Sequence, residues 1–239
     1  MWSICKKELN QFFSNLTGYM AIVLFLLING TFLFLLRDSS IFEYGYASID
    51  KFFELAPWVF LFLIPAITMR SLSDEFKAGT FEILQTRPLT SRQIVWGKYI
   101  SVLIIILFVI VPTFIYIITI RSLSTSGIDS GGITGSYIGL FLLGAVFAAI
   151  SICCSSFTNN AVVAFLISAF ACLSLYFGFN AISKLSILQG SADYYIEMLG
   201  IDFHYKSISR GVLDSRDLIY FITVIFLFLL ITVKNLYKK

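Results

Sequence analysis

The sequence predicts an all-α membrane protein with six transmembrane helices in a single domain over residues 1–239, and three observations support this. Of the 239 residues, 58% are hydrophobic and 13% are charged, a balance too apolar for an ordinary soluble domain. Apolar runs recur at close to the roughly 20 residues that a helix needs to cross the hydrocarbon core. Residues 130–183 contain no Asp, Glu, Lys or Arg, so this stretch is long enough to cross twice.

The hydrophobic runs define six predicted spans, at residues 18–36, 55–71, 99–120, 137–157, 161–182 and 218–233. The second and the sixth are short for a membrane crossing. Charged residues flank both of them and can reach the headgroups from a slightly buried position. Prolines fall in the second and third spans, where each can form either a hinge or a static bend.

The distribution of basic residues predicts the orientation, because basic residues favour the cytoplasmic side in short loops. With the N-terminus inside, the inner segments carry ten basic and four acidic residues. The outer segments then carry seven basic and ten acidic residues. We therefore expect a multi-pass protein of the cell's inner (cytoplasmic) membrane, with both termini in the cytoplasm.

Residues 1–16 are predicted to form an amphipathic helix at the cytoplasmic membrane surface. One face of this helix collects apolar side chains, with Ile4 as the misfit, and the members of that face are Trp2, Cys5, Leu9, Phe12, Phe13 and Leu16. Lysine and amide side chains lie opposite, as expected for an interfacial helix. A frayed tail is the alternative. We expect no cleavage of this segment, because the apolar run that follows lacks a small-residue cleavage site.

The polar segment 74–98 between the second and third spans carries helix start and stop signals. Thr80 is predicted to cap a short helix that runs to Gln85 and stops at Pro88. Thr90 and Gln93 have the spacing of a capping box at the start of the next helix, with Leu89 against Ile94 as its hydrophobic staple. From the residues alone, a well-capped cytoplasmic loop remains the alternative to a docking segment.

Several positions in this segment resemble type-2 ABC exporter permeases, namely Glu75, the Gly79-Thr80 pair, Glu82, Leu84, Pro88, Gly97 and Lys98. The resemblance implies that residues 74–98 form a coupling helix, which rests in a cleft on a separate ATPase subunit and transmits its closure to the membrane spans. The residues expected to couple to the ATPase are Glu75, Gly79, Thr80, Glu82, Ile83, Leu84 and Pro88.

Small residues at helical spacing predict close packing of the fourth and fifth spans as a hairpin around residues 157–160. The fourth span presents Gly144, Ala148, Ser151 and Ser155, preceded by Gly135 and Gly139, and the fifth presents Ala161, Ala164, Ser168 and Ala171. Small side chains let helix backbones approach closely in a membrane. A lining for a substrate path is the alternative role.

The outer segment 183–216 mixes aromatic and charged residues, which predicts short helices dipping into the outer interface. Asp214 and Asp217 are predicted to cap the last helix. His204, the single histidine, has no clustered partners in the sequence, so we expect no metal site. The four cysteines lie in or beside the membrane segments, and we expect no disulfide.

Motifs for catalysis are missing, so the chain is predicted to be a non-catalytic membrane subunit. The sequence contains no phosphate-binding P-loop, no HExxH and no CxxC. No ionisable residue lies deep within a predicted span, which argues against coupling to protons or sodium. We expect no cofactor on this chain, with ATP and Mg on the partner ATPase, and we expect membrane lipid but no nucleic acid among its partners.

The run from Phe203 to Phe221, with the polar segment and the chain length, resembles GldF, a family of permease subunits of gliding-motility ABC transporters in Bacteroidetes. The resemblance implies a GldA-like ATPase, a GldG-like auxiliary membrane protein with an outer domain, and a homodimer of the membrane subunit. Two functions remain open. The dimer either exports a substrate or transmits ATP-driven motion to an outer partner without transport. A purely structural scaffold would leave the polar segment unexplained.

Overall fold

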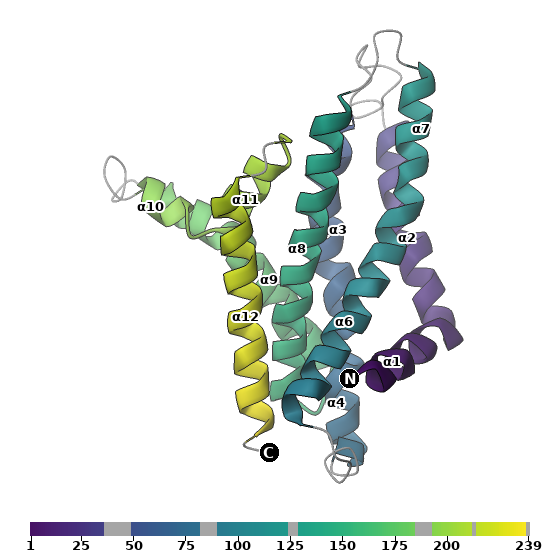
Figure 1. Ribbon diagram of the computed structural model, residues 1–239, viewed down its shortest axis with the longest axis vertical. Helices are drawn as coiled ribbons and strands as arrows, with labels where there is room; N and C mark the ends of the chain where they lie inside the picture. The colour runs from purple at the N-terminus through teal and green to yellow at the C-terminus, as the bar shows by residue number, and fades with distance from the viewer. Residues whose placement is uncertain (36–48, 82–89, 124–128, 185–192, 212–213, 238–239) are drawn as a thin grey trace.

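A computed structural model describes residues 1–35, 49–81, 90–123, 129–184, 193–211 and 214–237, and all regular structure in these ranges is helical (Figure 1). The predicted all-α fold is confirmed. The helices are α1 (Trp2–Ser14), α2 (Leu16–Phe34), α3 (Asp50–Thr68), α4 (Arg70–Lys77), α6 (Ser91–Ile110), the 3-10 turn η1 (Val111–Thr113), α7 (Phe114–Leu123), α8 (Ser130–Phe157), α9 (Ala161–Ser183), α10 (Asp193–Glu197), α11 (Ile201–Ile208) and α12 (Ser215–Leu236).

Five helical stretches of the described chain are long and apolar enough to cross a membrane, namely Asp50–Lys77, Ser91–Ser122, Ser130–Phe157, Ala161–Ser183 and Ser215–Leu236. A sixth is counted if Trp2–Ser14 and Gly18–Phe34, which meet at 70°, are taken together. The second and sixth predicted spans extend beyond their apolar runs, to 28 and 22 residues. The added residues include charged ones such as Asp50 and Lys77, which can reach the headgroups.

The bundle has two ends, which we name the α4 end and the α11 end. Figure 1 shows α4 and the C-terminus at its lower end, and α1 lying across the lower part of α6 with the N-terminus. Helices α10 and α11 lie toward the opposite end, beside the upper part of α12. The predicted short outer helices therefore exist as α10 and α11, whereas residues 185–192 lie outside the described part of the chain.

Helix α8 is the centre of the bundle and packs against α3, α6, α9 and α12 as well as α4 and α11. Nearly all of its side chains from Leu143 to Ser156 are buried. Its small residues allow close packing against several helices and not against α9 alone. Gly144 faces Ile106 of α6, and Gly139 faces Ile208 of α11 so closely that an added Cβ would lie 2.7 Å from its side chain. The hairpin to α9 is confirmed, with Asn160 capping α9.

The residue of α1 that lies off its predicted apolar face packs against the bundle. Ile4, the misfit of the helical wheel, is 6% exposed, whereas Trp2, assigned to the apolar face, is 70% exposed. Ile4 is buried because α1 and α6 cross closely at this point. An added Cβ on Gly97 of α6 would lie only 3.0 Å from Cβ of Ile4. Glycine at position 97 therefore lets α1 rest on α6 through Ile4.

Two of the spanning stretches contain a break in the α-helix. Pro112 lies in η1, where a 3-10 turn joins α6 to α7, because proline cannot donate the hydrogen bond that an α-helix requires there. The other break is at Met69, between α3 and α4. There Ser155 Oγ of α8 donates to Met69 O at 3.1 Å and accepts from the backbone N–H of Leu72 and Ser73, each at 3.2 Å.

We predict that Ser155→Ala lowers the free energy of unfolding by about 1–3 kcal/mol, because it leaves buried backbone groups at the α3–α4 break without a partner. Thermal unfolding in one detergent would measure the change. Ser130→Ala, at the exposed start of the same helix, is the control and should change stability little. Equal stability of the two variants would contradict a structural role for the Ser155 hydroxyl.

Candidate coupling site

A buried ammonium group organises the α4 end. The side chain of Lys98, near the start of α6, is 1% exposed, and its Nζ lies 2.8 Å from Glu8 Oε1 of α1 and 3.0 Å from Glu75 Oε1 of α4. It also donates to Ser71 O. Lys7 Nζ lies 3.2 Å from the same Glu75 oxygen. We name these four side chains, Lys7, Glu8, Glu75 and Lys98, the ion-pair cluster.

The ion-pair cluster makes α1, α4 and α6 one unit, because each helix contributes a charge that the others need. A charge removed from water in this way must be paired and hydrogen-bonded. Two lysines and two glutamates balance one another, so the cluster is neutral as a whole. It provides a mechanical link between helices and no catalytic chemistry.

Of the seven predicted coupling residues, three lie in the described part of the chain. Glu75 is turned inward, since its side chain is 11% exposed and bound to Lys98 and Lys7. Gly79 and Thr80 are exposed at the tip of the α4 end. Glu82, Ile83, Leu84 and Pro88 lie outside the described residues, and of the predicted helix from Thr80 to Gln85 only Thr80 and Phe81, both helical, are described.

Gly79 ends α4 and turns the chain away from it. Its φ of +66° is in the left-handed region, which glycine adopts without a steric penalty. Its N–H donates to Phe76 O, and Thr80 Oγ1 donates to Glu75 O at 3.4 Å. Phe81, which follows, is buried against Phe76 with ring centroids 5.0 Å apart. The chain that leaves α4 is therefore fixed at its first residues.

The predicted capping box at the start of α6 is confirmed. Gln93 N donates to Thr90 Oγ1 at 3.3 Å, and Thr90 N donates to Gln93 Oε1 at 3.2 Å. Its predicted staple involves Leu89, which lies outside the described residues. Because the box fixes where α6 begins, it also fixes the height at which Gly97 and Lys98 meet α1.

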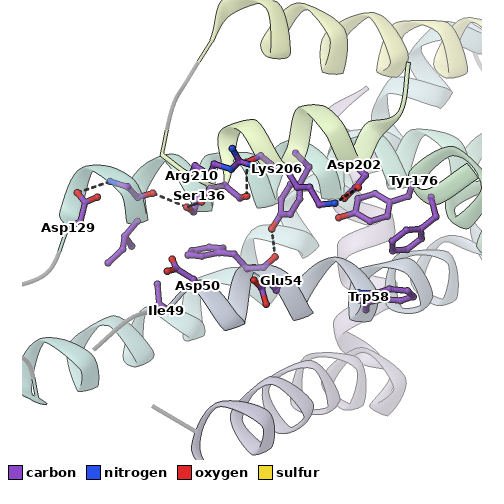
Figure 2. A pocket seen from close by; sticks show the side chains of 16 residues that line it. Ile49, Asp50, Glu54, Trp58, Asp129, Ser136, Tyr176, Asp202, Lys206 and Arg210 are labelled. Carbon is purple, nitrogen blue, oxygen red and sulfur yellow. Dashed lines mark hydrogen bonds and ion pairs between the residues drawn. The ribbon is translucent and has the colours of Figure 1, made fainter. Parts of the chain in front are cut away.

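The α11 end holds a cavity of about 880 Å³ between α3, α8, α9 and α11 (Figure 2). Charged groups of both signs surround it, among them Glu54, Asp202, Lys206 and Arg210, and Trp58 lies on the same wall. Lys206 Nζ is 2.6 Å from Asp202 Oδ2. Among the described residues, no group of His, Cys, Asp or Glu could hold a metal ion.

Helix α11 is anchored to the spans on three sides. Tyr205 OH donates to Phe53 O of α3 at 2.7 Å, and Ser136 Oγ of α8 donates to Ser209 O at 2.7 Å. Burial raises the pKa of the Tyr205 hydroxyl far above its usual value, with a further contribution from the nearby Asp202. Tyr205 therefore remains a hydrogen-bond donor at physiological pH.

The third anchor is His204, for which the sequence predicted no clustered metal-binding partners and which has hydrogen-bonding partners of another kind. Its Nδ1 lies 2.6 Å from Asp217 Oδ1 of α12, its Nε2 lies 2.8 Å from Met198 O, and its ring stacks on Tyr220 at 3.9 Å. The cap of α12 is formed by Asp214, which accepts from Arg216 N, and Asp217 turns to the histidine instead. A buried imidazole needs such a partner more than the helix end needs a second carboxylate.

Sequence reasoning missed the ion-pair cluster and the His204–Asp217 pair. One signal was available, because Lys98 directly precedes the apolar run of the third span and its ammonium must find a partner there. Its partner Glu8 lies 90 residues earlier in the chain. Local spacing carries no information on a pair so far apart.

We predict that Lys98→Met lowers the free energy of unfolding by about 3 kcal/mol, because Glu8 and Glu75 would lose the buried cation between them. Thermal unfolding in detergent would measure it. Adding Glu8→Gln and Glu75→Gln to Lys98→Met should recover much of the loss. Lys77→Met removes an exposed charge from α4 and serves as the control. A Lys98→Met protein as stable as this control would show that the cluster does not hold the helices together.

The profile described as "ABC-2 family transporter protein" matches residues 2–231, from α1 into α12. No curated protein matches the chain. The family is a membrane component of ABC transporters, and it implies an ABC ATPase as partner. Because the match spans nearly all of the 239 residues and the helices are apolar and long enough to cross a membrane several times, the chain belongs to the ABC-2 family of transporters, as the multi-pass permease of an ABC transporter.

Proposed function

We propose that this permease is the membrane subunit of an ATP-driven exporter associated with gliding motility, and that the α4 end receives the motion of the ATPase. The observation that carries the proposal is the ion-pair cluster. The chain leaves α4 at Gly79 toward the predicted contact residues, while Glu75, one turn earlier, is bound to Lys98 of α6. A force applied beyond Gly79 therefore acts on α1, α4 and α6 together.

The orientation belongs to the same proposal. The α4 end faces the cytoplasm of a cell with an inner membrane, where ATP is available, and both termini lie on that side. The excess of basic residues in the segments assigned to this side supports the orientation. The position of the C-terminus at the α4 end, with the N-terminus in the lower half of the bundle, also supports it (Figure 1).

The proposed partners follow from the resemblance. A GldA-like ATPase binds ATP and Mg and contacts Thr80, Glu82, Ile83 and Leu84, and Pro88 ends the contact helix. The membrane subunit forms a homodimer, and a GldG-like protein with an outer domain joins it. Glu75 is assigned to the link between the contact segment and the spans, since its carboxylate is held within the cluster.

A second function is favoured by a different observation, the anchoring of α11. Hydrogen bonds tie this helix to α3 and α8, and His204 ties it to α12. Such a helix moves with the spans and can pass their motion to an outer partner. The permease would then act as a mechanical transmitter without a transported substrate. Export remains the first proposal because the chain resembles type-2 ABC permeases that are exporters.

We predict that Glu82→Arg abolishes or strongly weakens co-purification of the ATPase, because it reverses a charge at the proposed contact. Pull-down from detergent-solubilised membranes and ATPase assay of the complex would measure it. Glu54→Arg, an equal charge reversal at the α11 end, is the control and should leave binding intact. Normal ATPase binding by Glu82→Arg would reject the proposed contact.

The two functions differ in what happens between the two copies at the α11 end. We predict for the exporter that a disulfide between copies through Tyr195→Cys, in a background without the native cysteines, depresses ATP hydrolysis several-fold in lipid nanodiscs. The path must open outward for the cycle to proceed, and both ends share one conformational equilibrium. Reductant should restore the activity. Unchanged hydrolysis in the cross-linked dimer would instead support the transmitter, in which no path has to open.

A further inference from the structure

The α4 end contains a second cavity, of about 540 Å³, between α1, α2, α6 and the junction of α3 with α4. It adjoins the ion-pair cluster and is lined in part by Lys7, Glu8 and Glu75. Of the proposed ATPase contacts only Thr80 also lines this cavity, and the export path proposed above lies between two copies of the chain. The cavity is therefore considered as a separate binding site.

Polarity changes along this cavity in the way it changes along a phospholipid. Toward the α4 end its wall is charged, with Arg70 and Asp74 of α4. Toward the middle of the bundle its wall is apolar, with Ile67 of α3 and Val102 and Ile105 of α6. A molecule with a charged head and a hydrocarbon tail matches this gradient, because each part meets its preferred surroundings.

Two buried polar atoms on this wall have no hydrogen-bond partner among the described residues, Ser71 Oγ and Glu75 Oε2. The hydroxyl can donate a hydrogen bond, and the carboxylate oxygen can only accept one. Arg70 and Asp74 are exposed at the mouth of the cavity, and neither forms an ion pair within the described part of the chain. Along α4, a cation and a hydrogen-bond donor, Arg70 and Ser71, are therefore available to a ligand. An anion and a hydrogen-bond acceptor, Asp74 and Glu75 Oε2, are available after them.

These four groups are ordered along α4. The cation and the donor, Arg70 and Ser71, are adjacent, and Asp74 and Glu75 follow four residues later on the same helix face. One such step is about 6 Å along a helix. A ligand that fits presents a negative group and, a short bridge away, a positive group with N–H donors.

The charge balance also points to a zwitterion. Around the cavity three cations, Lys7, Arg70 and Lys98, stand against three carboxylates, those of Glu8, Asp74 and Glu75. A net anion would gain no overall attraction here, and a net cation would gain none either.

We propose that this cavity binds the headgroup of phosphatidylethanolamine from the adjacent membrane leaflet. The phosphate meets Arg70 and Ser71, and the primary ammonium meets Asp74 and Glu75 Oε2. The glycerol end points toward Ile67 and Val102. A choline headgroup has no N–H to donate to the buried Glu75 oxygen, and an anionic glycerol headgroup supplies no cation to Asp74. The proposal does not depend on the ATPase partner or on export.

Native mass spectrometry of the full chain, purified in a mild detergent and delipidated, tests the proposal by titration with lipids of identical acyl chains. Phosphatidylethanolamine should bind at least about tenfold more tightly than phosphatidylcholine or phosphatidylglycerol, and Arg70→Gln and Ser71→Ala should each weaken it by about tenfold, the usual worth of one charge-assisted hydrogen bond. Lys77→Gln removes a charge from the same helix away from the cavity and should leave binding unchanged.

Equal affinity for the three lipids would overturn the proposal, as would an equal loss in Lys77→Gln. Preference for phosphatidylglycerol would assign the cavity to an anionic lipid instead. Failure of all three lipids to bind would also overturn it and would mean that water satisfies the two buried atoms. If Arg70→Gln does not yield a monodisperse protein, the smaller change Ser71→Ala decides, because it removes a single hydroxyl.

Discussion

An ammonium group buried in an apolar helix bundle can remain charged only where carboxylates reach it, and Lys98 meets this condition with one carboxylate from α1 and one from α4. The requirement fixes the relative height of three helices that are distant in the sequence. Other features at the α4 end depend on it. Gly97 has to be small so that α1 can come close enough for Glu8 to reach Lys98, and the capping box at Thr90 sets where Lys98 falls along α6.

Helix α8 connects this end of the molecule to the other. Near its C-terminus Ser155 bonds the break between α3 and α4, and near its N-terminus Ser136 bonds the backbone after α11. Both contacts use a serine hydroxyl against backbone, which suits a helix whose surface is largely small residues. A displacement of α4 relative to α8 would therefore strain contacts along a single stiff helix, as coupling between distant sites requires.

The sequence was sufficient where structure depends on neighbours in the chain. Hydropathy located the spanning helices, and side-chain spacing located the caps at Thr90 and Asp214, because these depend on interactions within a few residues. It was insufficient where the partner is distant. Ile4 is buried because α6 has a glycine at the crossing point, and a helical wheel of α1 holds no trace of that. His204 is hydrogen-bonded to Asp217 on another helix, and Lys98 is paired with Glu8 on another helix. Both pairs therefore depend on the packing of the whole bundle.

The neutrality of the ion-pair cluster has a consequence for the energy supply of the permease. Moving one elementary charge through the membrane potential changes the free energy by about 2.3 kcal/mol per 100 mV. Lys7 and Lys98 cancel Glu8 and Glu75, so the cluster that links α1, α4 and α6 carries no net charge when it moves as a body. The voltage across the membrane then neither assists nor opposes that movement, and the link can serve equally well in an energised and a depolarised cell.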